Sequence, residues 1–123
     1  MVLVDTSIWI GLYRKRTAEI GQKIWMLAGR NEAAVAGQIW VEFLGGFRDA
    51  GTRTAYEDKL RAYPFLETTR EAYDLAASLL ANHGRLGAGD AIIAATAITS
   101  DAALWTADRD LDDLAADGLR LFS

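Results

Sequence analysis

Four acidic residues stand where a carboxylate could do chemistry: Asp5, Glu42, Asp90 and Asp108. Asp90 is the clearest, because it heads a small and apolar stretch at residues 91–98. On a helix it shares a face with Ile93 and Ala97, so it stands at the head of an apolar stripe. Burying a carboxylate there is costly unless it has a partner, a metal ion or a crevice. The alternative is that Asp90 only stabilises the start of its helix, where negative charge is favoured.

The other three acids each follow an expected strand. Asp5 comes directly after the apolar run 2–4, Asp108 comes shortly after 102–105, and Glu42 lies one turn into a helix that follows 33–36. If these strands are parallel, their carboxyl ends face one crevice. Singly, Asp5 could be a helix cap, Glu42 an exposed helix residue and Asp108 one of several loop acids. Together, like charges require a cation, and oxygen ligands favour Mg²⁺, with Mn²⁺ as the alternative.

Neighbouring polar residues could support such a site. Three hydroxyls could orient the acids or hold a water molecule, although caps and turns explain them equally well: Thr6, Ser7 and Thr106. Arg85 and Arg109 each neighbour a suspected acid in sequence and could guide phosphates, whereas Arg14, Lys15 and Arg16 read as a solvated face. Asp110 is the rival of Asp108 as fourth acid, and Asp108 is preferred because it lies nearer the strand end.

Strand and helix patterns alternate along the chain. Strands are expected at 2–4, 33–36, 102–105 and 119–122, with a short edge strand at 65–66. Helices are expected from about residue 6 to 16 and at 18–27, 38–48, 52–62, 69–83, 88–99 and 111–116. The two glycines at 45 and 46 indicate close packing or an early end of the 38–48 helix. Thr68 and Glu71 fit a capping box before one of them. This order predicts a single α/β domain over residues 1–123, with a mainly parallel central sheet flanked by helices.

Composition excludes several classes of protein. The chain has 123 residues, no cysteine and a net charge of −4. Disulfides and thiolate metal sites are therefore excluded, and a reducing, cytoplasmic location is the expectation. A mildly acidic chain needs a local basic patch or a bridging metal ion to bind a polyanion. His83 is the one histidine and is expected to serve a helix C-terminus.

The motifs resemble those of the PIN-domain ribonucleases, especially the VapC-type toxins of prokaryotic toxin–antitoxin pairs. The similar segments are DTS at 5–7, Glu42, GDAIIAATA at 89–97 and LWTADRD at 104–110. The resemblance implies a PIN-like three-layer fold and metal-dependent RNA cleavage at Asp5, Glu42, Asp90 and Asp108, with Asp5, Asp90 and Asp108 as ligands. It also implies a homodimer and a cognate antitoxin protein. Leu111 departs from the family pattern, which usually has an aromatic there, and this concerns packing.

Two other functions remain open at this point. A phosphoryl-accepting module of the response-regulator kind would also use an acidic Mg²⁺ pocket, but it needs a lysine after a late strand, where this chain offers Arg109. A non-catalytic PIN-like scaffold would keep the fold without binding metal usefully. Dependence of RNA cleavage on a divalent ion separates these functions from a nuclease.

Overall fold

A parallel four-stranded sheet forms the centre of the protein in the computed structural model, which describes residues 1–15 and 17–123. Its order is β3-β2-β1-β4, with β1 (Val2–Val4) in register with both β2 (Ala33–Ala36) and β4 (Ala103–Trp105). The short β3 (Phe65–Leu66) pairs with β2 at one edge. Strands β1 and β2 are buried on both faces, which explains why they are continuous apolar runs rather than alternating ones.

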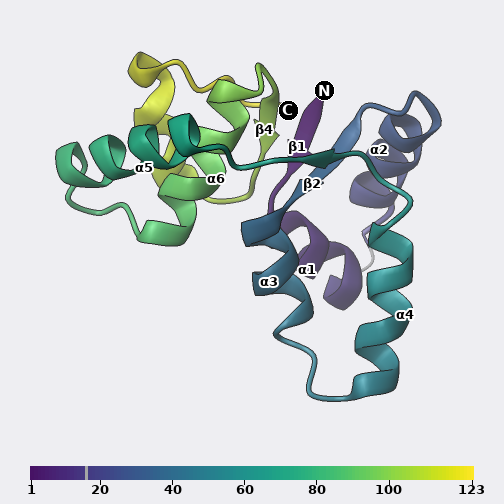
Figure 1. Cartoon of the computed structure of the whole chain (residues 1–123). Coiled ribbons are helices and arrows are strands. Elements are labelled where there is room, and N and C mark those ends of the chain that lie inside the picture. Colours follow the sequence, from purple (N-terminus) through teal and green to yellow (C-terminus); the bar gives the residue numbers. More distant parts are fainter. Residues whose placement is uncertain (16) are drawn as a thin grey trace.

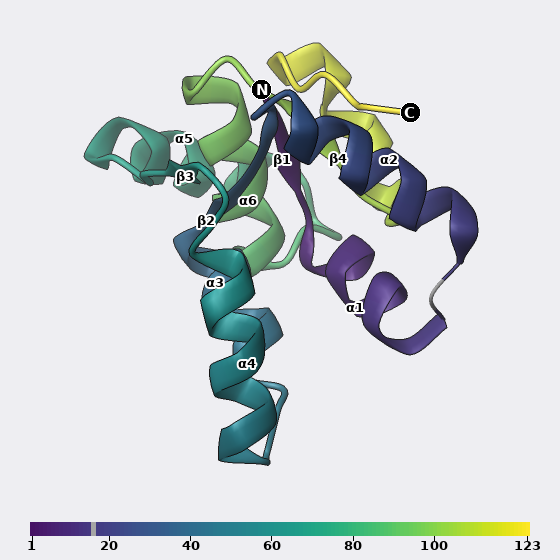
Figure 2. The ribbon, with the colours of Figure 1, turned by 90° about the vertical axis from the view of Figure 1, so that its right-hand side faces the viewer.

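Helices lie on both sides of this sheet, so the expected α/β fold with a parallel sheet is confirmed. Helices α5 and α6 lie on one side and α1 and α2 on the other, while α3 and α4 extend beyond the lower edge (Figures 1 and 2). The bounds are α1 (Thr6–Lys15), α2 (Ala18–Gly29), α3 (Gly37–Leu44), α4 (Ala50–Leu60), α5 (Arg70–Asn82), α6 (Ala88–Thr99) and the 3₁₀ helix η1 (Arg109–Asp117). Arg16, expected to close the first helix, lies outside the described residues.

Two local predictions were wrong. The expected strand at 119–122 is a single parallel bridge between Leu104 and Leu121. The other error concerns the capping of α5. Helix α3 ends at Leu44 rather than at residue 48, which is the early end that Gly45 and Gly46 indicate, because glycine disfavours a helix.

The cap of α5 is Thr69, whose hydroxyl accepts a hydrogen bond from the Ala72 amide at 3.2 Å. The expected capping box of Thr68 and Glu71 does not supply it. The Thr68 hydroxyl instead lies 2.8 Å from the hydroxyl of buried Thr96 on α6. A polar group inside the core requires a partner, and this contact provides one between the two helices.

Helix α6 is the buried helix of the fold, as its composition predicts. The side chains of Ala91, Ile93, Ala94, Ala95 and Ala97 are almost completely inaccessible. Its alanines allow close approach of α5 and the sheet, while burial of a side chain such as Ile93 contributes about 1.5–3 kcal/mol. The packing of α6 therefore fixes the position of its first turn, which carries Asp90. This turn lies at the lower edge of the sheet, meaning the end at which the parallel strands terminate.

Within the described residues, no helix combines the length and apolar character required to cross a membrane.

Candidate active site

Asp5 lies where β1 ends and α1 begins, and its side chain is almost fully buried. Its Oδ2 atom accepts two hydrogen bonds, from the Ser7 hydroxyl at 2.9 Å and from the Thr106 hydroxyl at 2.7 Å. Hydrogen bonds to an ionised carboxylate are the strong ones, and they offset part of the cost of burying the charge. Because both go to Oδ2, the Oδ1 atom remains available to bind a ligand.

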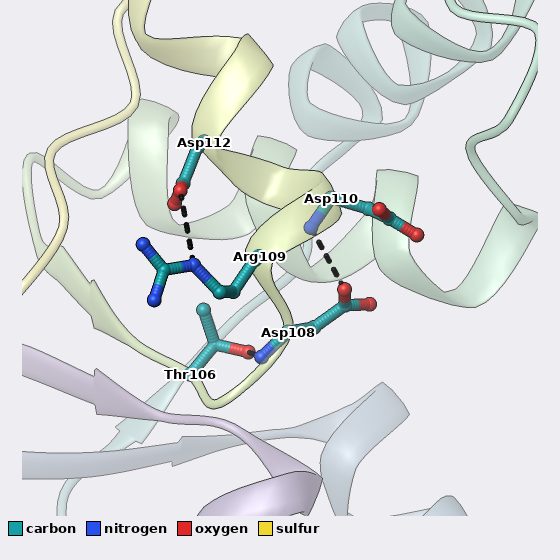
Figure 3. Close-up of polar contacts among 5 residues, drawn as sticks. All are labelled: Thr106, Asp108, Arg109, Asp110 and Asp112. Carbon is teal, nitrogen blue, oxygen red and sulfur yellow. Dashed lines mark hydrogen bonds and ion pairs between the residues drawn. The ribbon is translucent and has the colours of Figure 1, made fainter.

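The loop after β4 is built around the same two hydroxyls. The Ser7 hydroxyl accepts from the Ala107 amide, and the Thr106 hydroxyl accepts from the Asp108 amide, each at 3.0 Å. The Asp108 carboxylate in turn accepts from the Asp110 amide at 2.9 Å and caps η1 (Figure 3). The hydroxyls therefore connect the start of α1 to the loop that carries Asp108, as an acid-orienting role requires.

Glu42 reaches the same edge from α3, and both of its carboxylate oxygens are held. Oε1 accepts from the Thr6 hydroxyl at 2.6 Å, and Oε2 accepts from the Gln38 amide nitrogen Nε2 at 3.0 Å. Gly89 in the first turn of α6 makes room for this arrangement. A Cβ atom on Gly89 would lie only 2.6 Å from Glu42 Oε2 and 3.0 Å from Gln38 Nε2.

Asp90 is the acid whose chemistry is most altered by its surroundings. Burial raises the pKa of Asp90 to about 6, and repulsion from other carboxylates adds to the effect: Asp5, Asp108, Glu42 and Asp110, in decreasing order. This set contains the three other acids expected from the sequence, together with the alternative Asp110. A carboxylate that titrates close to neutral pH beside several anions attracts either a proton or a cation.

The donor set suits a hard divalent cation. Every candidate ligand is a carboxylate or hydroxyl oxygen, as Mg²⁺ and Mn²⁺ prefer. Within residues 1–15 and 17–123, no three acidic or histidine side chains stand close enough to form a ready-made metal cluster. Mg²⁺ commonly retains several water ligands and takes only one or two protein carboxylates, so it does not require such a cluster. Asp5, Asp90 and Asp108 are the residues that would hold it.

The two arginines expected to guide phosphates lie in different settings. Arg85 lines a cavity beside Asp90. Arg109 is 92% exposed, and its Nε atom lies 3.9 Å from Asp112 Oδ2. In Figure 3 the carboxylates of Asp108 and Asp110 point to one side of the loop, while Arg109 and Asp112 point to the other. The structure therefore does not bring Arg109 to the acids.

Gln38 and Gly89 belong to this site and were not singled out from the sequence. Gln38 precedes Glu42 by four residues, which places the two side chains on one helical face. That spacing was a readable signal. The contribution of Gly89 depends on how closely α3 approaches α6, and no local sequence pattern contains that distance.

Known proteins share this architecture. The PIN domain family profile matches residues 2–117. Ribonuclease VapC10 of Mycobacterium tuberculosis is 31% identical over 111 residues, covering 86% of this chain and 81% of its own.

Solved structures agree over nearly the whole chain. The DNA-bound VapBC complex of Salmonella typhimurium superposes with a TM-score of 0.83 at 17% identity, covering 98% of this chain and 96% of that one. VapBC2 of Rickettsia felis, bound to a promoter DNA fragment, gives 0.81 at 19% identity, covering 99% and 98%. VapC20 of Mycobacterium tuberculosis, a toxin that cleaves the sarcin–ricin loop, gives 0.69 at 19% identity, covering 97% and 96%. The family match, with this fold and its edge of acids, places the chain in the PIN-domain family as a member of the VapC type.

Proposed function

We propose that this protein is a metal-dependent endoribonuclease and the toxin of a type II toxin–antitoxin pair. The observation that carries the proposal is the raised pKa of Asp90, caused by burial and by the surrounding carboxylates. Such a site is poised to exchange a proton for a divalent cation near neutral pH. The relationship to Ribonuclease VapC10 gives the substrate class.

The residues of the site have two kinds of proposed role, holding the metal ion and orienting the acids. Asp5, Asp90 and Asp108 would hold Mg²⁺ or Mn²⁺, and a bound ion would supply an activated water and positive charge beside the phosphate. Ser7 and Thr106 fix the Asp5 carboxylate by donating to its Oδ2 atom. Thr6 and Gln38 hold the Glu42 carboxylate by hydrogen bonds. Glu42 would accept a proton from the attacking water.

RNA cleavage by purified protein tests the activity. Cleavage should require a divalent ion, stop in EDTA and return when excess Mg²⁺ or Mn²⁺ is added. Asp5→Asn should be inactive while remaining folded, because the amide oxygen can still accept the two hydroxyl hydrogen bonds. Asp58→Asn, an exposed acid on α4, serves as the matched control and should cleave like wild type. Full activity after verified removal of metal would exclude the mechanism, and no cleavage with either metal would favour a scaffold.

A protein antitoxin is the proposed partner, and the solved VapBC complexes support it. An arginine from the antitoxin could pair with the acids and take the place of the cation. Trp25 on α2, 82% exposed, and Tyr13 on α1, 39% exposed, offer apolar anchors. Co-expression with a small neighbouring reading frame should yield a stable complex with suppressed nuclease activity. Separate purification of the two proteins, with unchanged activity on mixing, would reject this partner.

A homodimer is part of the same proposal. Val41 is 68% exposed and Phe65 is 46% exposed, and both line a cavity of about 650 Å³ with Trp40. Exposed apolar groups of this kind mark association surfaces. Light scattering of the free protein should give twice the mass of the chain, and Val41→Glu should shift it to the monomer.

A further inference from the structure

A cavity of about 230 Å³ adjoins the acidic site on the side of α6 that faces η1. Asp90 forms part of its wall, so the cavity is continuous with the site. Asn82 at the end of α5 and Arg85 in the turn to α6 form one side, and η1 forms the other through Asp110 and Asp113. Leu86 and Leu114 supply apolar surface.

The polar groups around this cavity are free to bind a ligand. Throughout the part of the chain that the structure describes, the side chains of Asn82, Arg85, Asp110 and Asp113 make no hydrogen bond or ion pair with another residue. Asp112 and Arg109, which neighbour them on η1, instead face each other on the other side of the loop (Figure 3). The cavity therefore combines apolar surface with exposed donors and acceptors that a ligand can reach without breaking a contact within the protein.

The two walls are held at a fixed separation. His83 Nε2 lies 2.9 Å from Asp117 Oδ2, joining the end of α5 to the end of η1. Both side chains are about one-third exposed. Because this contact spans sequence positions 34 apart, it fixes the turn carrying Arg85 against the helix carrying Asp113.

We infer that this cavity is a base-binding subsite for the nucleotide beside the scissile phosphate, with a preference for guanine. The three carboxylates in its wall would repel a phosphate, whereas a base presents a flat apolar body with a polar edge. The volume is below the roughly 300–1,000 Å³ of clefts that bind drug-sized ligands, which suits one ring system. The inference rests on the proposed nuclease activity only for the identity of its substrate.

Guanine is favoured by the pattern of donors and acceptors. Its Watson–Crick edge presents two adjacent donors, the ring N1–H and the exocyclic N2 amino group, which match the two oxygens of one carboxylate. Adenine and cytosine offer one exocyclic amino donor, and the uracil imide N–H lies between two carbonyl acceptors that a carboxylate repels. Asp113 is placed to accept from guanine, and the Arg85 guanidinium to stack on the base.

Binding without metal tests the subsite independently of catalysis. Guanosine, inosine, adenosine and uridine are titrated at equal concentrations into protein in EDTA, and amide NMR shifts are followed at Gly84, Leu86 and Leu114. Guanosine should give the tightest binding, and inosine, which lacks the N2 amino group, should bind more weakly. Asp113→Asn should lower the guanosine affinity at least tenfold, because an amide offers one acceptor rather than two. Asp112→Asn, its neighbour outside the cavity, should bind like wild type.

Cleavage of oligoribonucleotides separates this inference from the nuclease proposal. Wild type should cut next to guanine, and Asp113→Asn should lose at least tenfold in kcat/KM at those sites, mainly through KM, while Asp112→Asn does not. Selective guanosine binding without any RNA cleavage would uphold the subsite and reject the nuclease. Metal-dependent cleavage with no base preference, together with equal shifts from all four nucleosides, would overturn the subsite and leave the nuclease intact.

Discussion

Glu42 and Asp90 lie at one edge of the sheet, yet their carboxylates meet opposite conditions. Glu42 receives a hydrogen bond on each oxygen, from Thr6 and from Gln38, so the position of its carboxylate is fixed. The pKa of Asp90 is raised by burial and by its acidic neighbours, so its charged form is the disfavoured one. Two carboxylates with surroundings this different can take separate roles.

Gly89 controls whether Glu42 can keep its place. We predict that Gly89→Ala leaves the free energy of unfolding within about 1 kcal/mol of wild type, since alanine suits a helix better than glycine does. The new Cβ atom would lie 2.6 Å from Glu42 Oε2, so the carboxylate must move away from its partners. Misplacement of this size can cost about 100-fold in rate, which a cleavage assay would measure.

Gly29→Ala is the matched control, because a Cβ atom on that glycine of α2 meets nothing within 4 Å. Its cleavage rate should equal that of wild type. A Gly89→Ala protein that cleaves RNA normally would show that the position of Glu42 is unimportant for the reaction.

At the scale of elements, the site depends on two segments a hundred residues apart. The start of α1 and the loop after β4 meet because β1 and β4 are parallel neighbours, with Val4 in register with Trp105. The hydroxyls of Ser7 and Thr106 then bridge the two segments through Asp5 and the amides of the loop. The sheet brings the two segments close together, and the two hydroxyls then orient the Asp5 carboxylate and the loop that carries Asp108.

Removing one of these hydroxyls tests that division. We predict that Thr106→Val lowers the free energy of unfolding by about 1–3 kcal/mol, because one lost hydrogen bond goes to a buried carboxylate. Cleavage should fall as well, since Asp108 loses the partner of its amide. Thermal melts and the cleavage assay measure the two effects.

Thr99→Val provides the comparison within the same chain. Among residues 1–15 and 17–123, the Thr99 hydroxyl bonds only to carbonyl groups of its own helix, at Ala95 and Thr96. Its removal should change stability by about 0.5 kcal/mol or less and leave cleavage unchanged. Equal losses in both variants would mean that Thr106 has no special connection to the site.

Sequence patterns predicted the elements better than the contacts between them. Apolar runs followed by acids gave β1, β2 and β4 and placed Asp5 and Asp108 at one edge, because parallel strands share a carboxyl end. The single bridge at Leu121 was overestimated as a strand, since alternating apolar residues look the same whether or not a partner strand is long enough. The distances at Gly89 and the direction of Arg109 depend on packing between separate elements, which no local pattern records.

At the scale of the whole molecule, the net charge of −4 disfavours binding of the proposed RNA substrate, which is also negatively charged. The negative charges that act on Asp90 come from different segments: the junction between β1 and α1, helix α3, the loop after β4, and η1. When no cation is bound, the mutual repulsion of these charges destabilises the folded state. Function and stability therefore oppose each other at this edge of the sheet.

Asp90 makes this opposition measurable as a pH dependence. Its pKa of about 6 in the folded protein exceeds the ordinary value of 3.8, so the folded state holds the proton more tightly than the unfolded state does. The stability conferred by the protonated carboxyl is complete below pH 3.8 and is lost as the pH rises through about 6. Metal-free wild type should therefore be less stable at pH 7 than a variant in which this charge is absent.

Asp90→Asn is that variant, and it should be more stable than wild type in EDTA at pH 7 by about 1 kcal/mol. A fully buried group with this shift would give more, but partial access of water to the carboxyl reduces the effect. The difference should vanish near pH 4, where wild-type Asp90 is protonated as well. Excess Mn²⁺ should raise the melting temperature of wild type by binding the folded state, and should raise that of the variant less. A variant that melts below wild type in EDTA and still cleaves RNA would show that Asp90 only supports the first turn of α6, and would remove it from the site.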